Sequence, residues 1–135
     1  MNATILKLRH LMNSHDAEGM SGCFSPTYRS SQPVHPNRGF GGRHQVAANW
    51  DDMFRGVPDL IGEVAAETED GDTSWVEWIW HGHHADGSPF EMRGVTVMTV
   101  GDDGLIAEAR LYMEPVEQDS AAIDEAVRRL AGPAR

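Results

Sequence analysis

The 135-residue chain contains a single cysteine, Cys23, and no run of apolar residues long enough to cross a bilayer. A lone cysteine cannot form an internal disulfide, and without a cysteine cluster the chain cannot build a structural zinc site from thiolates. A spanning helix needs about 18 consecutive apolar residues, and the N-terminus lacks the basic-then-apolar order of a signal peptide. We therefore expect a cytoplasmic protein that has no membrane partner.

Basic residues are also scarce, because 11 Lys and Arg stand against 21 Asp and Glu, for a net charge of −10. The excess is local: residues 59–135 hold seventeen acidic and five basic side chains. A surface of this charge repels phosphate backbones and anionic lipids, which excludes nucleic acid as the main partner. The same acidic exterior disfavours anionic small molecules, so a neutral or cationic ligand is expected.

Helical spacing of apolar residues predicts a helix over about residues 4–12. Ser14 is expected to cap a second short helix, which would turn Phe24 inward and end at Ser25-Pro26. Residues 32–42 are rich in proline and glycine and are expected to form a loop. The next periodic stretch predicts a helix that ends at Pro58 and shares one apolar face among Val46, Trp50, Met53, Phe54 and Val57.

After residue 59 the pattern changes to four β-rich runs, at about 60–68, 74–85, 90–100 and 105–114. Turn signals of the Asp-Gly type separate them, which predicts an antiparallel meander. A last helix is expected over about 119–131. Helices followed by a meander indicate an α+β fold in which the helices cover one sheet face. Residues 1–135 are expected to form a single domain.

Five short segments add a family resemblance that covers about residues 4–117. They are Ser14-His15-Asp16-Ala17, Phe40-Gly41-Gly42-Arg43, Pro58-Asp59-Leu60, Trp78-Ile79-Trp80-His81-Gly82-His83-His84 and Arg110-Leu111-Tyr112-Met113-Glu114. With the order of elements, they resemble the SnoaL-like families of the nuclear-transport-factor-two-like, or cystatin-like, superfamily, which also holds ketosteroid isomerase and limonene epoxide hydrolase. The resemblance implies a cone: a curved antiparallel sheet wrapped around helices, with an apolar cavity inside, commonly in a homodimer packed through the sheets.

When the catalytic positions of these relatives are matched to this chain, their catalytic side chains are missing. The acid of the isomerising and hydrolysing relatives falls on Thr96, and the epoxide hydrolases' arginine and second aspartate fall on Gly94 and Leu111. The isomerases' tyrosine and aspartate fall near Leu8 and Gln32. Whether the chain is an enzyme therefore stays open. Among groups expected at the cavity mouth, Tyr28, His35 and His84 are the candidate general acids or bases, and His84 matches a histidine common in SnoaL-like strands.

The wall of the cavity depends on the turn at Asp86-Gly87. Trp78 and Trp80 share one strand face, and a three-residue loop would place them beside Met92 and Thr96, whereas a two-residue loop would separate the two sets. We favour the joined arrangement, which gives one wall of aromatic and methionine side chains; the alternative for each residue is ordinary core packing. The predicted ligand-binding residues are Gln32, Trp50, Phe54, Trp78, Trp80, Met92, Thr96, Leu111 and Met113.

Two further groups lie on strands of the meander. His81 and His83 share a face, but a metal site would need three or four convergent ligands, so neither metal nor cofactor is expected. In the last strand, Ala109, Leu111 and Met113 are expected to face inward. Arg110, Tyr112 and Glu114 then occupy the convex face, where a charged and aromatic row suits a homodimer contact.

Two functions follow as hypotheses. In the first, the chain binds a polycyclic or terpenoid-like apolar molecule in its cone, with a proton-transfer reaction such as isomerisation or cyclisation. In the second, it is a non-catalytic ligand-binding or dimerisation module whose cavity is filled by its own side chains.

Overall fold

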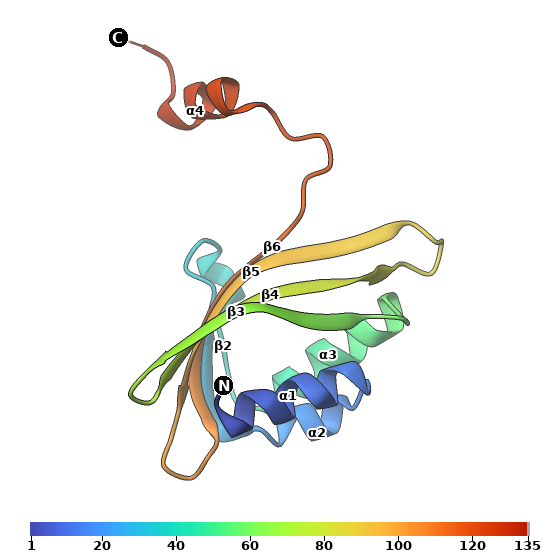
Figure 1. The fold of residues 1–135 in the computed structure, drawn as a ribbon, viewed down its shortest axis with the longest axis vertical. Helices are drawn as coiled ribbons and strands as arrows, with labels where there is room; N and C mark the ends of the chain where they lie inside the picture. Colours follow the sequence, from blue (N-terminus) through green and yellow to red (C-terminus); the bar gives the residue numbers. More distant parts are fainter. Residues whose placement is uncertain (135) are drawn as a thin grey trace.

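The computed structural model describes residues 1–134, which fold into a six-stranded sheet with helices packed on one face (Figure 1). The helices are α1 (Ala3–Asn13), α2 (Ala17–Ser21), α3 (His44–Gly56) and α4 (Ile123–Ala131), with a 3-10 turn at Pro36–Arg38. The strands are β1 (Phe24–Ser31), β2 (Phe40–Gly41), β3 (Ile61–Asp70), β4 (Thr73–His83), β5 (Pro89–Val100) and β6 (Ile106–Pro115). No helix within the described residues is long and apolar enough to span a membrane.

The strand order is β2-β1-β6-β5-β4-β3. Strands β3 to β6 form the antiparallel meander that the turn signals predicted. Strand β1 joins it by pairing parallel with β6, for example Ser30 against Ala109, so the sheet as a whole is mixed. A parallel partner needs a long connection, and the chain from Ser31 to Ile106, which contains α3 and strands β2 to β5, provides it. The predicted α+β cone is confirmed, with this parallel pair added to it.

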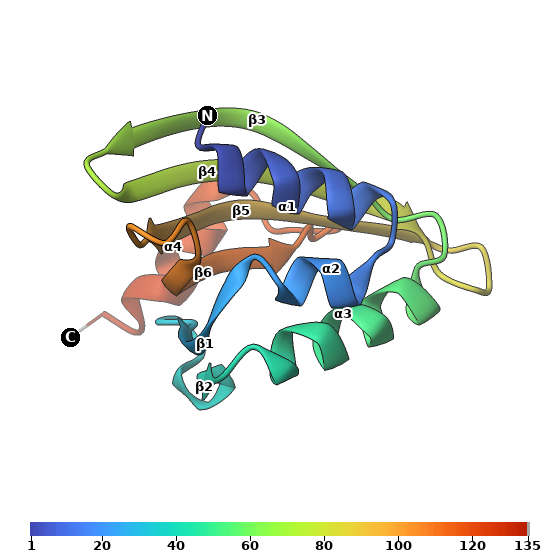
Figure 2. The same cartoon turned by 90° about the horizontal axis from the view of Figure 1, so that it is seen from below.

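The helices α1, α2 and α3 all lie on the concave side of the curved sheet (Figures 1 and 2). Helix α1 buries Ile5, Leu8 and Met12 against it, at the i, i+3 and i+7 positions of one helical face. Opposite them, Trp78 on β4 is fully buried. Burying a large apolar side chain of this kind stabilises the fold by about 1.5–3 kcal/mol, so the core sits between α1 and the centre of the sheet.

The second helix differs from the prediction. Its N-cap is Asp16, whose side chain accepts a 2.8 Å hydrogen bond from the backbone N–H of Gly19, whereas Ser14 closes α1. Phe24 lies in β1 rather than on the helix. Pro26 therefore lies inside a strand, in the stretch where the register of β1 against β6 is irregular. A proline lacks the N–H that a regular ladder requires, which accounts for its place in an irregular stretch.

The hairpin between β4 and β5 settles which residues share a face. The backbone N–H of His84 donates to the carbonyl of Ser88, leaving three residues, 85–87, in the turn. As a result Trp80 pairs with Met92, and Val76 pairs with Thr96. Directly paired residues of antiparallel strands point to the same face, so the joined arrangement of the wall is confirmed.

Strand β6 also has the predicted orientation. Ala109 and Met113 are buried on the concave side, whereas Arg110, Tyr112 and Glu114 are exposed on the convex face. Alternation of this kind is expected of a strand with one solvated face.

Helix α4 is shorter than predicted and stands apart from the rest. It lies on the side of the sheet opposite α1, α2 and α3 (Figure 1). Its apolar residues Ile123, Val127 and Leu130 follow helical spacing, yet Ile123 is 75% exposed and Leu130 is 87% exposed. The helix is therefore amphipathic, and no apolar surface of the same chain covers its apolar face within the described residues.

Candidate ligand-binding cavity

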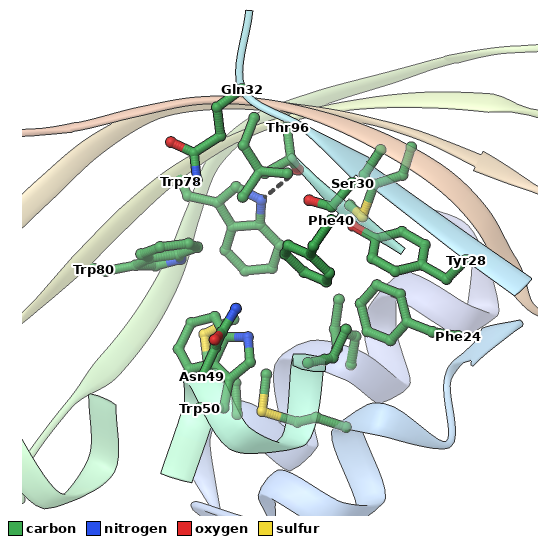
Figure 3. Close-up of a pocket in the computed structure, with 17 residues that line it drawn as sticks. Phe24, Tyr28, Ser30, Gln32, Phe40, Asn49, Trp50, Trp78, Trp80 and Thr96 are labelled. Atoms are coloured by element: carbon green, nitrogen blue, oxygen red, sulfur yellow. Dashed lines mark hydrogen bonds between the residues drawn. The ribbon is translucent and has the colours of Figure 1, made fainter. Parts of the chain in front are cut away.

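A cavity of about 110 Å³ lies between the concave face of the sheet and α1, α2 and α3 (Figure 3). The strands contribute Phe24, Tyr28, Ser30, Phe40, Trp78, Trp80, Thr96, Met98, Ala109 and Leu111. The helices and the loop after β1 contribute Leu8, Met12, Met20, Gln32, Val46, Asn49 and Trp50. None of these side chains carries a charge at neutral pH, and Asn49 is exposed, which places it at the rim.

Aromatic rings form much of the wall. The Trp50 and Trp80 rings meet edge to face with centroids 5.1 Å apart, and Trp78 and Trp80 have centroids 6.3 Å apart. On the other side Tyr28 and Phe40 meet edge to face at 6.0 Å. Edge-to-face contacts add about 0.5–1.5 kcal/mol beyond the buried area, so these rings hold one another in place around the cavity.

Thr96 holds the central ring of the wall. Its hydroxyl oxygen accepts a 2.8 Å hydrogen bond from the indole nitrogen of Trp78, and both groups are buried. A hydroxyl that accepts one bond still has its own proton to donate. Thr96 occupies the position at which, by the family resemblance, hydrolysing relatives carry an acid, and here that position orients an aromatic ring.

Gly94, the position matched to the epoxide hydrolases' arginine, admits no side chain. Its φ angle is +154°, and a Cβ atom there would come within 1.9 Å of the Tyr112 carbonyl oxygen. Strands β5 and β6 approach too closely at this point for any residue but glycine. Thr96, Leu111, Leu8 and Gln32, the other positions at which the resemblance places the relatives' catalytic groups, all border the cavity.

Tyr28 is the one titratable side chain that borders the cavity among the described residues. It is 3% exposed, and burial raises the pKa of its hydroxyl, while a side-chain hydrogen bond with Ser30 lowers that pKa in part. Desolvation penalises the phenolate, so the hydroxyl stays protonated well past neutral pH. Tyr28 can therefore donate a hydrogen bond or a proton but cannot serve as a base near neutral pH.

Three amide and indole groups complete the polar part of the lining. At the rim, the Gln32 side-chain oxygen accepts from the Arg38 guanidinium at 3.2 Å, and the Asn49 side-chain oxygen accepts from the Gln45 amide at 2.7 Å. Trp80 is buried at 6% exposure, and its indole nitrogen has no hydrogen-bond partner within residues 1–134.

Two of the predicted catalytic residues lie outside the cavity. His35 turns away to contact the carboxylate of Glu114 on β6, with Nε2 and Oε1 2.5 Å apart. His84 follows the end of β4 and lies in the hairpin turn, where its ring meets Phe90 edge to face at 5.6 Å. Both predictions placed these histidines too close to the cavity, since the loop and the hairpin carry them past its border.

Three predicted ligand-binding residues also lie behind the wall. Phe54 stacks on His15, with ring centroids 4.3 Å apart, and His15 in turn contacts the Leu60 carbonyl through Nε2 at 2.7 Å. Met92 and Met113 pack against the core without reaching the cavity. They support the wall rather than form it.

Several lining residues were not predicted as such: Met12, Met20, Phe24, Ser30, Phe40, Val46, Asn49 and Ala109. Of these, Val46 was predicted to lie on the apolar face of its helix. No local pattern marks Asn49, a polar residue on the exposed edge of α3.

The strand-end histidines pair with separate carboxylates. His81 lies 3.4 Å from Glu63, and His83 lies 2.7 Å from Asp59. The His83 side chain and backbone N–H both donate to Asp59 and lower the pKa of that carboxyl. Within residues 1–134, no three His, Cys, Asp or Glu side chains converge in a way that could hold a metal ion.

Solved structures share this fold. One is a protein from Jannaschia sp. classed with the SnoaL-like polyketide cyclases, with 24% identity and a TM-score of 0.69 over 82% of this chain and 83% of that one. A Mycobacterium tuberculosis protein in complex with estradiol-17β-hemisuccinate has 20% identity and a TM-score of 0.69, over 81% and 89% of the two chains. A Catenulispora acidiphila protein with a ketosteroid isomerase-like fold, in complex with trimethylamine, has 12% identity and a TM-score of 0.70, over 80% and 82%.

Sequence comparison agrees with the fold. No match was found among curated proteins. A sequence model of the SnoaL-like domain matches residues 5–109, which include every residue that lines the cavity except Leu111. Since this match spans well over half of the chain, the protein belongs to the SnoaL-like domain family.

Proposed function

We propose that the protein binds a compact, neutral and largely apolar small molecule in the cavity. The observation that carries this proposal is the lining itself: within the described residues it contains no carboxylate, ammonium, guanidinium or imidazole group. A charged ligand would have to leave water without an ion-pair partner, which costs several kcal/mol. The acidic exterior adds a further barrier for anions.

The size of the cavity limits the ligand further. An engineered cavity of about 150 Å³ accepts benzene, whereas pockets for drug-sized ligands measure about 300–1,000 Å³. At about 110 Å³ the present cavity suits a single small ring or a molecule as compact as the trimethylamine of the Catenulispora acidiphila protein. A polycyclic or terpenoid-like ligand would need the cavity to widen, and the flexible side chains of Met12, Met20 and Met98 are the ones best able to move.

The residues that line the cavity support ligand binding better than they support catalysis. A proton-transfer reaction such as isomerisation or cyclisation needs a base as well as an acid, and among the described residues the cavity offers only the neutral hydroxyl of Tyr28 as a titratable acid. Any such reaction would use Tyr28 as the acid and take its base from the substrate or from water. A non-catalytic ligand-binding protein is the alternative, and the absence of a carboxylate from the lining favours it.

We further propose that two copies associate through the convex face. Tyr112 is 39% exposed at the middle of β6, beside the exposed side chain of Arg110. Glu114, the third residue predicted there, is engaged by His35 of the same chain. The exposed apolar side of α4 lies on the same side of the sheet (Figure 1), and a second copy would cover it.

A fluorescence titration tests ligand binding. Trp50, Trp78 and Trp80 border the cavity, so a bound molecule should change the tryptophan emission in a saturable way. Cyclopentanol and cyclopentanecarboxylate form a matched pair that differs mainly in charge and absorbs no excitation light. Cyclopentanol should bind with an affinity that added salt barely changes, and the carboxylate should not bind. If neither cyclopentanol nor any other neutral molecule of one ring changes the emission, the proposal is wrong.

A further inference from the structure

The indole N–H of Trp80 is a buried donor without an acceptor. Trp80 is 6% exposed and borders the cavity, and its nitrogen has no partner within residues 1–134. Leaving a buried donor unpaired costs about 1–3 kcal/mol, and buried polar groups in proteins are nearly always paired. Trp78, the other β4 tryptophan that borders the cavity, has its acceptor in Thr96. The unpaired donor is therefore particular to Trp80.

Asn49 brings a second donor to the same part of the cavity. Its side-chain oxygen accepts from the Gln45 amide, so the N–H groups of Asn49 remain available to donate. Figure 3 shows the Asn49 side chain reaching into the cavity below Trp80, with its nitrogen on the cavity side. Two N–H donors from β4 and α3 thus border one part of a cavity whose lining is mostly apolar.

Two neighbouring donors in a mostly apolar lining fit a particular kind of ligand. An oxygen with two lone pairs can accept from both donors at once, and a carbonyl oxygen is the neutral group best suited to this. A hydrocarbon would leave both donors unpaired, and an ammonium group would meet N–H groups of the same polarity. An alcohol could accept from both donors, but its own hydroxyl proton would then need an acceptor as well.

We propose that the N–H groups of Trp80 and Asn49 together hold the oxygen of a small aldehyde or ketone, whose hydrocarbon body fills the aromatic part of the cavity. This inference rests on the proposed binding function and names the class of its ligand. Because the two donors contact only the ligand's oxygen, they select for a carbonyl group. The hydrocarbon ring of the ligand is selected by its shape.

Two ligands of nearly the same shape isolate the oxygen: cyclopentanone and methylenecyclopentane, in which a CH₂ group replaces the carbonyl oxygen. Their affinities are compared in the wild-type protein and in Trp80→Phe, which keeps an aromatic ring and removes the N–H. The different hydration of the two ligands cancels when the ratio of their affinities is compared between the wild type and a variant. Trp75→Phe is the matched control, because it makes the same change on the same strand at a position that does not border the cavity.

The affinity for cyclopentanone divided by that for methylenecyclopentane should be about 3- to 10-fold lower in Trp80→Phe than in the wild type. A change of this size is the effect of losing one neutral hydrogen bond. Trp75→Phe should bind both ligands as the wild type does and leave the ratio unchanged. An unchanged ratio in Trp80→Phe overturns the carbonyl inference while the proposed binding function stands. If neither ligand binds the wild-type protein, the proposed function fails together with the inference.

A spectroscopic readout on the wild-type protein does not depend on the variants folding. The Trp80 indole proton gives its own signal in a ¹H–¹⁵N spectrum, which can be assigned by through-space contacts with the neighbouring Gly62 and Trp50. Cyclopentanone should shift this signal downfield as the hydrogen bond forms, and methylenecyclopentane should not. Equal shifts with both ligands would contradict the inference.

Discussion

The indole nitrogen of Trp78 donates a 2.8 Å hydrogen bond to the hydroxyl of Thr96, across two neighbouring strands and inside the cavity wall. The bond fixes the central ring of the cavity wall (Figure 3). It also gives a structural role to the position where the family resemblance placed an acid.

Thr96→Val tests that role. The substitution keeps the shape of the side chain but leaves the buried Trp78 donor without an acceptor, so the free energy of unfolding should fall by about 1–3 kcal/mol. Thr96→Ser keeps the hydroxyl, so its free energy of unfolding should fall by less. Urea denaturation of the three proteins measures the difference. Equal stability of Thr96→Val and the wild type would show that the bond contributes nothing.

Asp59 should make stability depend on pH. The His83 hydrogen bonds lower the pKa of Asp59 in the folded protein below that of the unfolded chain, about 3.9. The folded protein therefore gains stability from this pair above about pH 4 and loses it as the pH falls through the folded-state pKa. Asp59→Asn should flatten this acid loss, measured by urea midpoints from pH 7 to pH 3. His83→Gln, which keeps the backbone donor, should give an intermediate profile.

Tyr28 should act at the opposite end of the pH scale. Burial raises its folded-state pKa above the unfolded value of about 10. The contribution to stability is thus complete below pH 10 and is lost as the pH rises through the folded-state pKa. The tyrosinate absorbance that Tyr28→Phe removes should appear only above pH 10 in the wild type. A Tyr28 titration below pH 10 would mean that solvent reaches the hydroxyl.

Helix α4 should matter for association. Leu130→Glu places a charge on the exposed apolar side of the helix, and it should shift the protein from a dimer toward a monomer, as measured by analytical ultracentrifugation. Arg128→Glu, on the polar side of the same helix, should leave the dimer intact. A wild-type protein that is monomeric at all concentrations, or a Leu130→Glu protein that stays dimeric, would contradict the proposed association.

Periodicity and turn residues predicted most of the fold. The four strands of the meander lie within about two residues of the expected runs, because Asp-Gly turns and alternating apolar residues are local signals. Strand β1 was harder to place, since Pro26 interrupts it and its partner β6 lies about eighty residues later in the chain. Such pairing depends on tertiary contacts that no local pattern reports.

The cavity was predictable only in part. The sheet side followed from strand alternation once the three-residue turn was chosen, which placed Trp78, Trp80 and Thr96 correctly. Asn49 and the outward turn of His35 depend on how the loop after β1 and helix α3 pack on the sheet. His84 missed the cavity by a single residue, because β4 ends at His83.

Filling the cavity tests the central claim most directly. Ala109 borders the cavity and Ala107 is exposed, two residues away on the same strand, so Ala109→Leu and Ala107→Leu add the same atoms inside and outside it. Cyclopentanol binding is then measured by calorimetry on all three folded proteins. We predict that Ala109→Leu abolishes binding and that Ala107→Leu binds like the wild type. Undiminished binding to Ala109→Leu would show that the ligand sits elsewhere.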